Sequence, residues 1–133
     1  MIISVSDHED KAEHDLNLSH SLLKLNEHLD WCITSAFYFA LHCVDCYAKK
    51  HGINSFRPNR NETISAHRKR INYVNSDINP LFTTYKRIYD RSMQCRYDPT
   101  YFKKITPIIA TFLYDITTNC LVNLGLFPKA RVP

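Results

Sequence analysis

Glycine is scarce in this 133-residue chain, which contains only Gly52 and Gly125. Sheet proteins need glycine-containing turns and alternating apolar and polar residues, and the scarcity of both argues against all-β and doubly wound folds. No apolar run reaches the ~18 residues of a membrane-spanning helix, and residues 1–5 lack the basic and apolar segments of a signal peptide. We therefore expect a helical, soluble protein of the cytoplasm that does not enter a membrane.

The cysteines do not form the pattern of a disulfide framework. There are five of them, an odd number, and most lie within apolar segments rather than loops. Cys43 and Cys46 form a Cys-x-x-Cys pair, but no second ligand pair at zinc-site spacing accompanies it. We therefore expect buried thiols, and we predict neither a metal site nor a bound cofactor.

The remaining pattern predicts one all-α domain over residues 1–133, with its core over about residues 6–125 and a tail over 126–133. The first helix is expected to begin at a Ser6-x-x-Glu9 capping box and to end near residue 27. The expected ranges of the other helices are about 30–51, 63–73, 80–97 and 106–124. Short connections make an up-and-down bundle of four to five helices the simplest packing.

Apolar spacing also predicts which face of the last helix points inward. We expect Ile108, Ile109 and Phe112 to lie on its buried side, because they recur at helical spacing with Ile116 and Cys120. Gly125 is expected to end this helix.

A polar stripe interrupts the apolar second helix. Its members lie three and four residues apart and therefore share one face: Ser35, Tyr38, His42, Asp45 and Lys49. Buried polar groups need partners, and suitable candidates occur elsewhere in the chain: His67, Arg70, Arg91, Arg96 and Tyr97. The stripe is explained either by pairing within the bundle or by a pocket for an anion or nucleotide.

Charge is distributed unevenly along the sequence. Residues 1–48 contain eight acidic and two basic side chains, whereas residues 49–104 contain four acidic and thirteen basic ones. The basic middle of the chain can attract phosphate groups, including those of RNA. It can equally pair with the acidic first segment of the same chain or of a second copy.

The order of several short segments resembles the HEPN-like helical domains of prokaryotes over about two thirds of the chain. These segments are Asp30-Trp31, Phe37-Tyr38-x-x-Leu41-His42, His67-x-x-Arg70, Tyr85-x3-Tyr89 and Arg91-Ser92-x3-Arg96-Tyr97. The resemblance implies a four- or five-helix bundle, commonly a homodimer, in systems that handle nucleotides or RNA. It also implies, for some members, a nucleotidyltransferase partner in a toxin–antitoxin pair, and for others a metal-independent ribonuclease activity.

Catalytic members of that family have an Arg-x4–6-His signature near the start of the final core helix. Arg60 and His67 are the match in this chain, but they lie in the loop and early third helix, and no histidine follows His67. We therefore expect a non-catalytic, dimeric module for protein interaction or for nucleotide or nucleic-acid binding, with His42, Asp45, Arg70, Arg91, Arg96 and Tyr97 as binding residues. The alternatives are a ribonuclease that uses Arg60 and His67 or an atypical Arg/His set, and a purely structural bundle.

Overall fold

The computed structural model describes residues 3–127, and all regular secondary structure in this range is helical. The five α-helices are α1 (Val5–Leu25), α2 (Leu29–Lys50), α3 (Ala66–Asp77), α4 (Phe82–Tyr97) and α5 (Pro107–Asn123). Two short 3₁₀ helices, η1 (Asn79–Leu81) and η2 (Tyr101–Lys104), flank α4. The prediction of an all-α domain with five helices is confirmed.

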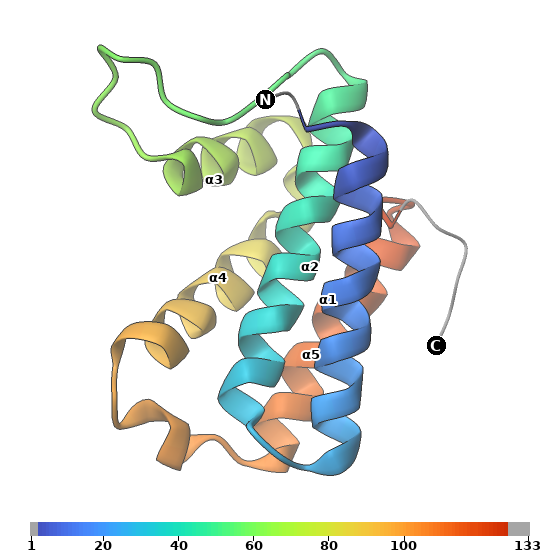
Figure 1. Cartoon of the computed structure of the whole chain (residues 1–133), viewed down its shortest axis with the longest axis vertical. Helices are drawn as coiled ribbons and strands as arrows, with labels where there is room; N and C mark the ends of the chain where they lie inside the picture. Colours follow the sequence, from blue (N-terminus) through green and yellow to red (C-terminus); the bar gives the residue numbers. More distant parts are fainter. Residues whose placement is uncertain (1–2, 128–133) are drawn as a thin grey trace.

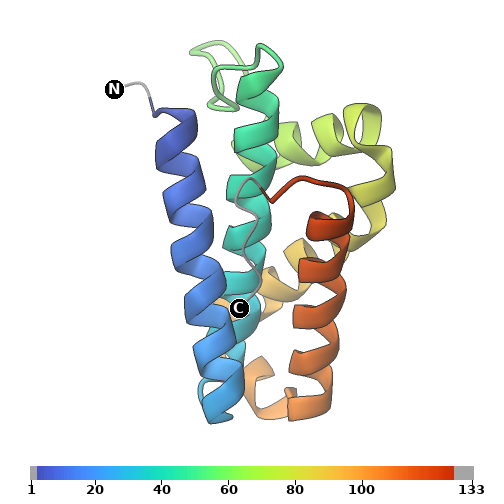
Figure 2. The same ribbon diagram turned by 90° about the vertical axis from the view of Figure 1, so that its right-hand side faces the viewer.

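Helix α2 is the centre of the arrangement, and it packs against α1, α4 and α5. Figure 1 shows α1 and α2 side by side and antiparallel, with α4 running obliquely away from the C-terminal half of α2. Figure 2 shows α5 along the other side of α2, whereas α3 lies across the long axis near the end of α2. The up-and-down description therefore fits α1, α2 and α5 but not α3.

The first helix begins two residues earlier than predicted, because a different capping box forms. Ser4 Oγ accepts a hydrogen bond from the backbone N–H of Asp7 at 3.0 Å, and the Asp7 carboxylate accepts one from the N–H of Ser4 at 3.1 Å. Asp7 takes the place that Glu or Gln has in the usual capping box, and Ser4 has the extended backbone that an N-cap requires.

Other helix boundaries also differ from the sequence prediction. Asp30 lies in the first turn of α2 rather than at its N-cap, because Asn26 ends α1 in the left-handed conformation and His28, also left-handed, is the N-cap of α2. Helix α3 begins at Ala66, where Ser65 caps the N–H of Arg68, and not near residue 63. Gly52 has a φ of 94°, which agrees with the predicted glycine stop after α2.

The core gathers around the apolar faces of α2. Phe37 and Phe39 are completely buried, and Phe37 makes ring contacts with Tyr85 and Tyr89 of α4. The buried side chains of α1, α3 and α5 include Ala12, Leu16, Ile71, Val74, Leu113 and Leu121.

All five cysteines are free thiols, three of them buried and two half-buried. None of the helices within residues 3–127 is long and apolar enough to cross a membrane.

The prediction for the inner face of α5 is wrong for Ile108, Ile109 and Phe112, whereas Cys120, also predicted there, packs against the core. Ile108 and Phe112 are 82% and 54% exposed, and Ile109 is also an exposed residue, whereas Leu113 and Leu121 are buried. Helix α5 has apolar residues on both sides, so its periodicity did not determine which side faces α2. An apolar surface of α5 is therefore left in solvent.

Leu126 and Phe127, the first two residues of the predicted tail, pack against the core. Leu126 is buried, and the ring of Phe127 meets that of Phe39 edge-on at 5.1 Å between centroids. The core thus extends beyond the predicted limit of residue 125, and the rest of the predicted tail, 128–133, lies outside the described residues.

Candidate functional site

An ion pair between α2 and α3 forms the centre of the candidate site. Arg70 donates from Nε to Asp45 Oδ1 at 2.7 Å and from Nη2 to Asp45 Oδ2 at 3.0 Å. The two side chains are only 15% and 10% exposed. Burial disfavours the charged guanidinium, but the hydrogen bonds and the attraction of Asp45 outweigh it, so the pKa of Arg70 is raised.

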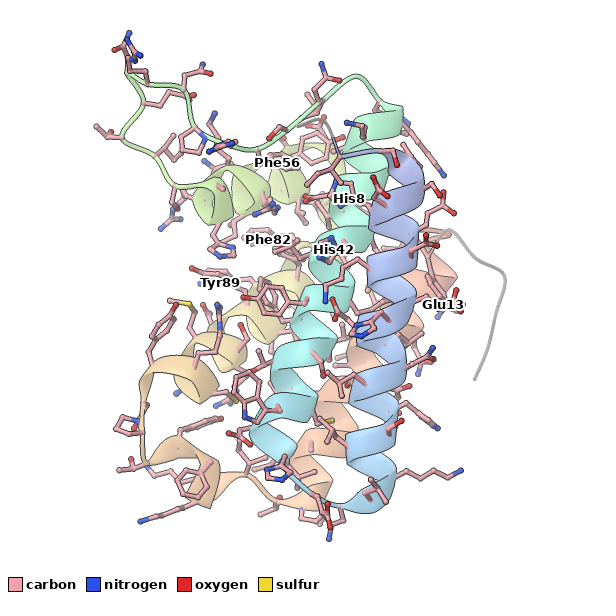
Figure 3. The ribbon with its side chains drawn as sticks, in the orientation of Figure 1. His8, Glu13, His42, Phe56, Phe82 and Tyr89 are labelled. Carbon is pink, nitrogen blue, oxygen red and sulfur yellow. The ribbon has the colours of Figure 1, made fainter. Side chains whose placement is uncertain are left out.

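Two histidines meet beside this ion pair, where α1 packs on α2. His8 Nδ1 and His42 Nδ1 lie 3.1 Å apart, and their ring centroids are separated by 5.3 Å. Figure 3 shows both rings at this interface, with Phe56 near the loop that follows α2. Burial lowers the pKa of His8, and it lowers the pKa of His42 to about 4, so both imidazoles are neutral at pH 7.

Asp15 of α1 approaches the other ring nitrogen of His42. Its Oδ2 atom lies 4.0 Å from His42 Nε2 and has no hydrogen-bond partner among residues 3–127, although the side chain is only 6% exposed. Its Oδ1 atom accepts from Lys11 Nζ at 2.9 Å and faces His14 Nδ1 at 3.3 Å. Asp15 therefore has one satisfied oxygen and one that points unpaired toward His42.

A cavity of about 340 Å³ opens between the start of α1, the end of α2, the loop after α2 and α3. Its apolar lining comes from Ile3, Ile53 and Phe56, and its polar lining comes from His8, Asp45, Asn54, Ser55, Arg57 and Arg70. Phe56 supports the Arg70 guanidinium, whose carbon lies 5.5 Å from the ring centroid. The volume falls in the range of small-molecule sites, roughly 300–1,000 Å³.

A second polar cluster lies nearer the N-terminus of α2, where α2 packs against α4. Arg96 donates to the Tyr38 hydroxyl at 3.0 Å, and its guanidinium covers the rings of Tyr38 and Phe37. His67 contacts the rings of Phe37 and Tyr89, and its Nδ1 atom is buried with no hydrogen-bond partner in the described range. Burial first, and then the positive charges of Arg70 and Arg96, lower the pKa of His67.

The structure thus places the predicted binding residues in two separate clusters and leaves Arg91 outside both. His42, Asp45 and Arg70 belong to the first cluster, whereas Arg96 belongs to the second. Arg91 donates to Gln94 at 3.2 Å and to the Tyr101 hydroxyl at 2.9 Å, away from the α2 stripe. Tyr97 is 69% exposed beneath the Arg96 guanidinium.

The predicted catalytic pair is not brought together. Arg60 lies in an exposed turn of the loop, whereas His67 is half-buried in the first turn of α3. No hydrogen bond or ring contact joins them in the described part of the chain, and the charges that act on His67 come from Arg70, Arg96 and Asp45. A role for Arg60 and His67 as a pair has no geometric support in one copy of the chain.

Sequence reasoning missed three contributors to the site: His8, Asp15 and Arg57. His8 and Asp15 share a buried face of α1 with Ala12, Leu16 and Ser19. Their spacing of seven residues was the available signal, because it places two ionisable side chains on an apolar stripe. Arg57 had no such signal, since it lies in a loop without periodicity.

Comparison with known proteins gives no family or relative: the chain matches no family model, no curated protein and no solved structure.

Proposed function

We propose that this protein is a non-catalytic, HEPN-like binding module that takes a phosphate-bearing ligand of nucleotide size into the cavity between α1, α2 and α3. The observation that carries the proposal is the pair of arginines at this cavity. Arg57 lines it and forms no ion pair within residues 3–127, and Arg70 lines it with a guanidinium fixed by Asp45.

Arg70 keeps hydrogen-bonding capacity for a ligand. A guanidinium has five N–H donors, and two of them, on Nε and Nη2, bond to Asp45. The side chain is held on both sides, by the carboxylate and by the ring of Phe56, so little conformational entropy is lost when a phosphate binds. Arg57, by contrast, supplies a charge that no carboxylate of the described residues pairs with.

The rest of the lining suits a nucleoside as well as its phosphate. Ile3, Ile53 and Phe56 offer apolar surface, and Asn54 and Ser55 offer polar groups that can bond to a base or a ribose. The surrounding segment, residues 49–104, has an excess of nine positive charges, which raises the rate at which anions arrive.

The proposal includes a second copy of the chain and, following the HEPN-like resemblance, a nucleotidyltransferase-type partner in a toxin–antitoxin system. The support for a homodimer is the exposed apolar face of α5, with Ile108, Ile109, Phe112 and Val122 in solvent. Apolar patches of this kind are typical of protein–protein contacts.

Calorimetric titration with AMP and with inorganic phosphate tests the binding proposal. We expect AMP to bind more tightly than phosphate and to raise the melting temperature, since a ligand selective for the folded state stabilises it. Arg57→Ala should weaken AMP binding about tenfold or more, because a charge-assisted hydrogen bond contributes roughly 1.5–3 kcal/mol. Arg60→Ala is the matched control, as Arg60 belongs to the same loop but does not line the cavity.

The proposal fails if millimolar AMP and phosphate give neither heat nor a thermal shift. It also fails if Arg57→Ala and Arg60→Ala bind AMP with equal affinity, since the ligand would then occupy another surface.

A metal-independent ribonuclease is the second candidate, and the state of His67 favours it. Burial and the charges of Arg70 and Arg96 lower the pKa of this imidazole, which favours its neutral form, and Nδ1 has no hydrogen-bond partner among residues 3–127. A neutral imidazole can accept the proton of a 2′-hydroxyl, and a guanidinium can stabilise the charge that develops on phosphate. RNA cleavage that persists in EDTA, survives Arg60→Ala and disappears in His67→Ala would establish this candidate in place of the first.

A further inference from the structure

We infer that His8, His42 and Asp45 form a binding site for a divalent transition-metal ion, with Zn²⁺ as the best fit, at the interface of α1 and α2. One ligand atom from each residue lies within 4.8 Å of the others. This site goes beyond the proposed nucleotide binding and stands or falls independently of it.

The spacing of the two histidines fits a shared metal. Zn–N bonds of 2.0–2.1 Å in tetrahedral geometry place two ligand nitrogens about 3.3 Å apart. His8 Nδ1 and His42 Nδ1 are 3.1 Å apart, so a small outward shift accommodates the ion. Both rings are held by neighbouring helices, because His8 is buried on α1 and His42 belongs to the packed stripe of α2.

Asp15 supplies the independent observation that points to a metal. In zinc sites, the ring nitrogen that does not bind the metal commonly donates to a carboxylate, which fixes the tautomer. Asp15 Oδ2 is buried, has no partner in the described range and lies 4.0 Å from His42 Nε2. A proton on Nε2 of His42 would face Asp15 Oδ2, and a movement that closes the 4.0 Å separation to hydrogen-bond length would satisfy this oxygen and leave the lone pair of Nδ1 directed toward His8.

Asp45 can bind the ion while it stays paired with Arg70. Each carboxylate oxygen has two lone pairs, and Arg70 uses one on each at 2.7 and 3.0 Å. Hydrogen bonds to a ligating carboxylate are a regular feature of metal sites. The arginine would therefore orient Asp45 as Asp15 orients His42.

Three protein ligands leave a fourth position open, as in catalytic zinc sites. Because His8 and Asp45 also line the cavity, that position is accessible to water or to an anionic ligand from the cavity.

The test is a titration of the chelator-treated, full-length protein with Zn²⁺ by calorimetry and with Co²⁺ by absorption spectroscopy. We expect one equivalent of Zn²⁺ per chain and a Co²⁺ spectrum without a thiolate charge-transfer band. His8→Gln and His42→Gln should each weaken Zn²⁺ binding at least 100-fold. Asp15→Asn, which keeps the side-chain shape, should weaken it about 10- to 100-fold.

His51→Gln is the control, because His51 is exposed at the end of α2 and outside the site. Circular dichroism confirms that each variant is folded before titration, and Asp15→Asn tests the site even where a ligand variant unfolds. The inference is overturned if wild-type protein binds no Zn²⁺ below millimolar concentration, or if His42→Gln and Asp15→Asn bind it like wild type. A thiolate band with Co²⁺ also overturns it, since the ion would then lie at a cysteine such as Cys46.

Discussion

The buried pair of Asp45 and Arg70 can be compared with an exposed pair of the same length in the same protein. Lys86 Nζ lies 2.7 Å from Asp90 Oδ1, as Arg70 Nε lies 2.7 Å from Asp45 Oδ1. The exposed pair has side-chain exposures of 39% and 53%, against 15% and 10% for the buried one. The pairs also differ in their cation, and the first joins two helices whereas the second lies within one, but burial is the largest contrast. Asp45→Asn and Asp90→Asn therefore test what burial contributes.

We expect Asp45→Asn to lower the free energy of unfolding by about 3 kcal/mol, because it leaves the Arg70 guanidinium charged, mostly buried and opposite a neutral amide. For a domain of this size the melting temperature should fall by roughly 10 °C. Asp90→Asn should cost about 0–1 kcal/mol, since water solvates Lys86 once its partner is lost.

Urea denaturation followed by circular dichroism measures both values, and a double-mutant cycle isolates the pair. Arg70→Met removes the unpaired charge, so the combination of Asp45→Asn with Arg70→Met should be clearly less destabilised than the sum of the two single variants. Equal losses for Asp45→Asn and Asp90→Asn, or additive effects in the cycle, would refute the argument from burial.

Three further predictions concern other parts of the molecule. Burial lowers the pKa of His42 from about 6.5 in the unfolded chain to about 4 in the folded protein, so the unfolded state binds more protons between these pH values. The free energy of unfolding should therefore fall as the pH drops from about 6.5 to 4. His42→Gln should flatten the pH dependence of the melting temperature in this window. Ile108→Asp should convert a dimer to a monomer in sedimentation equilibrium, because Ile108 is 82% exposed on the proposed contact surface. Helicity should be kept, since an acid in the first turn of a helix suits the helix dipole. Wild-type protein that is already monomeric would contradict the proposed dimer. Phe37→Ala should lower the free energy of unfolding, measured by urea denaturation, by about 3–5 kcal/mol, because the fully buried ring contacts four other aromatic side chains. A loss below about 1 kcal/mol would show that the aromatic cluster does not stabilise the fold.

Local sequence patterns predicted the position of a helix in the bundle only where one arrangement was physically consistent with the pattern. Helix α2 is apolar nearly all round with one polar stripe, and a central position is the arrangement that satisfies such a helix. Helix α5 has apolar residues on opposite sides, such as Ile108 and Leu113, so the choice between its faces depended on the shape of the surrounding helices. The sequence does not contain that shape in any local form.

The residues of the candidate site could likewise be predicted only where a pattern within one helix placed them together. The stripe placed His42 and Asp45 on one face, and Arg70 was among the partners that the sequence proposed for it. His8 and Asp15 were missed because they approach from α1, and the contact of His8 with His42 spans 34 positions in sequence. The docking of α1 against α2 determines which of several polar residues on α1 lies opposite the stripe, and periodicity within one helix does not specify that register.

The position of α3 has a consequence for the energetics of opening. This helix contributes only two buried side chains, Ile71 and Val74, and the ion pair from Arg70 to Asp45 ties it to α2. Such a segment opens at a lower free energy than the helices that form the core, so its amide hydrogens should exchange sooner than those of α2. A ligand held between Arg57 and Arg70 would stabilise the docked position of α3, so slower amide exchange in α3 would measure occupancy of the cavity.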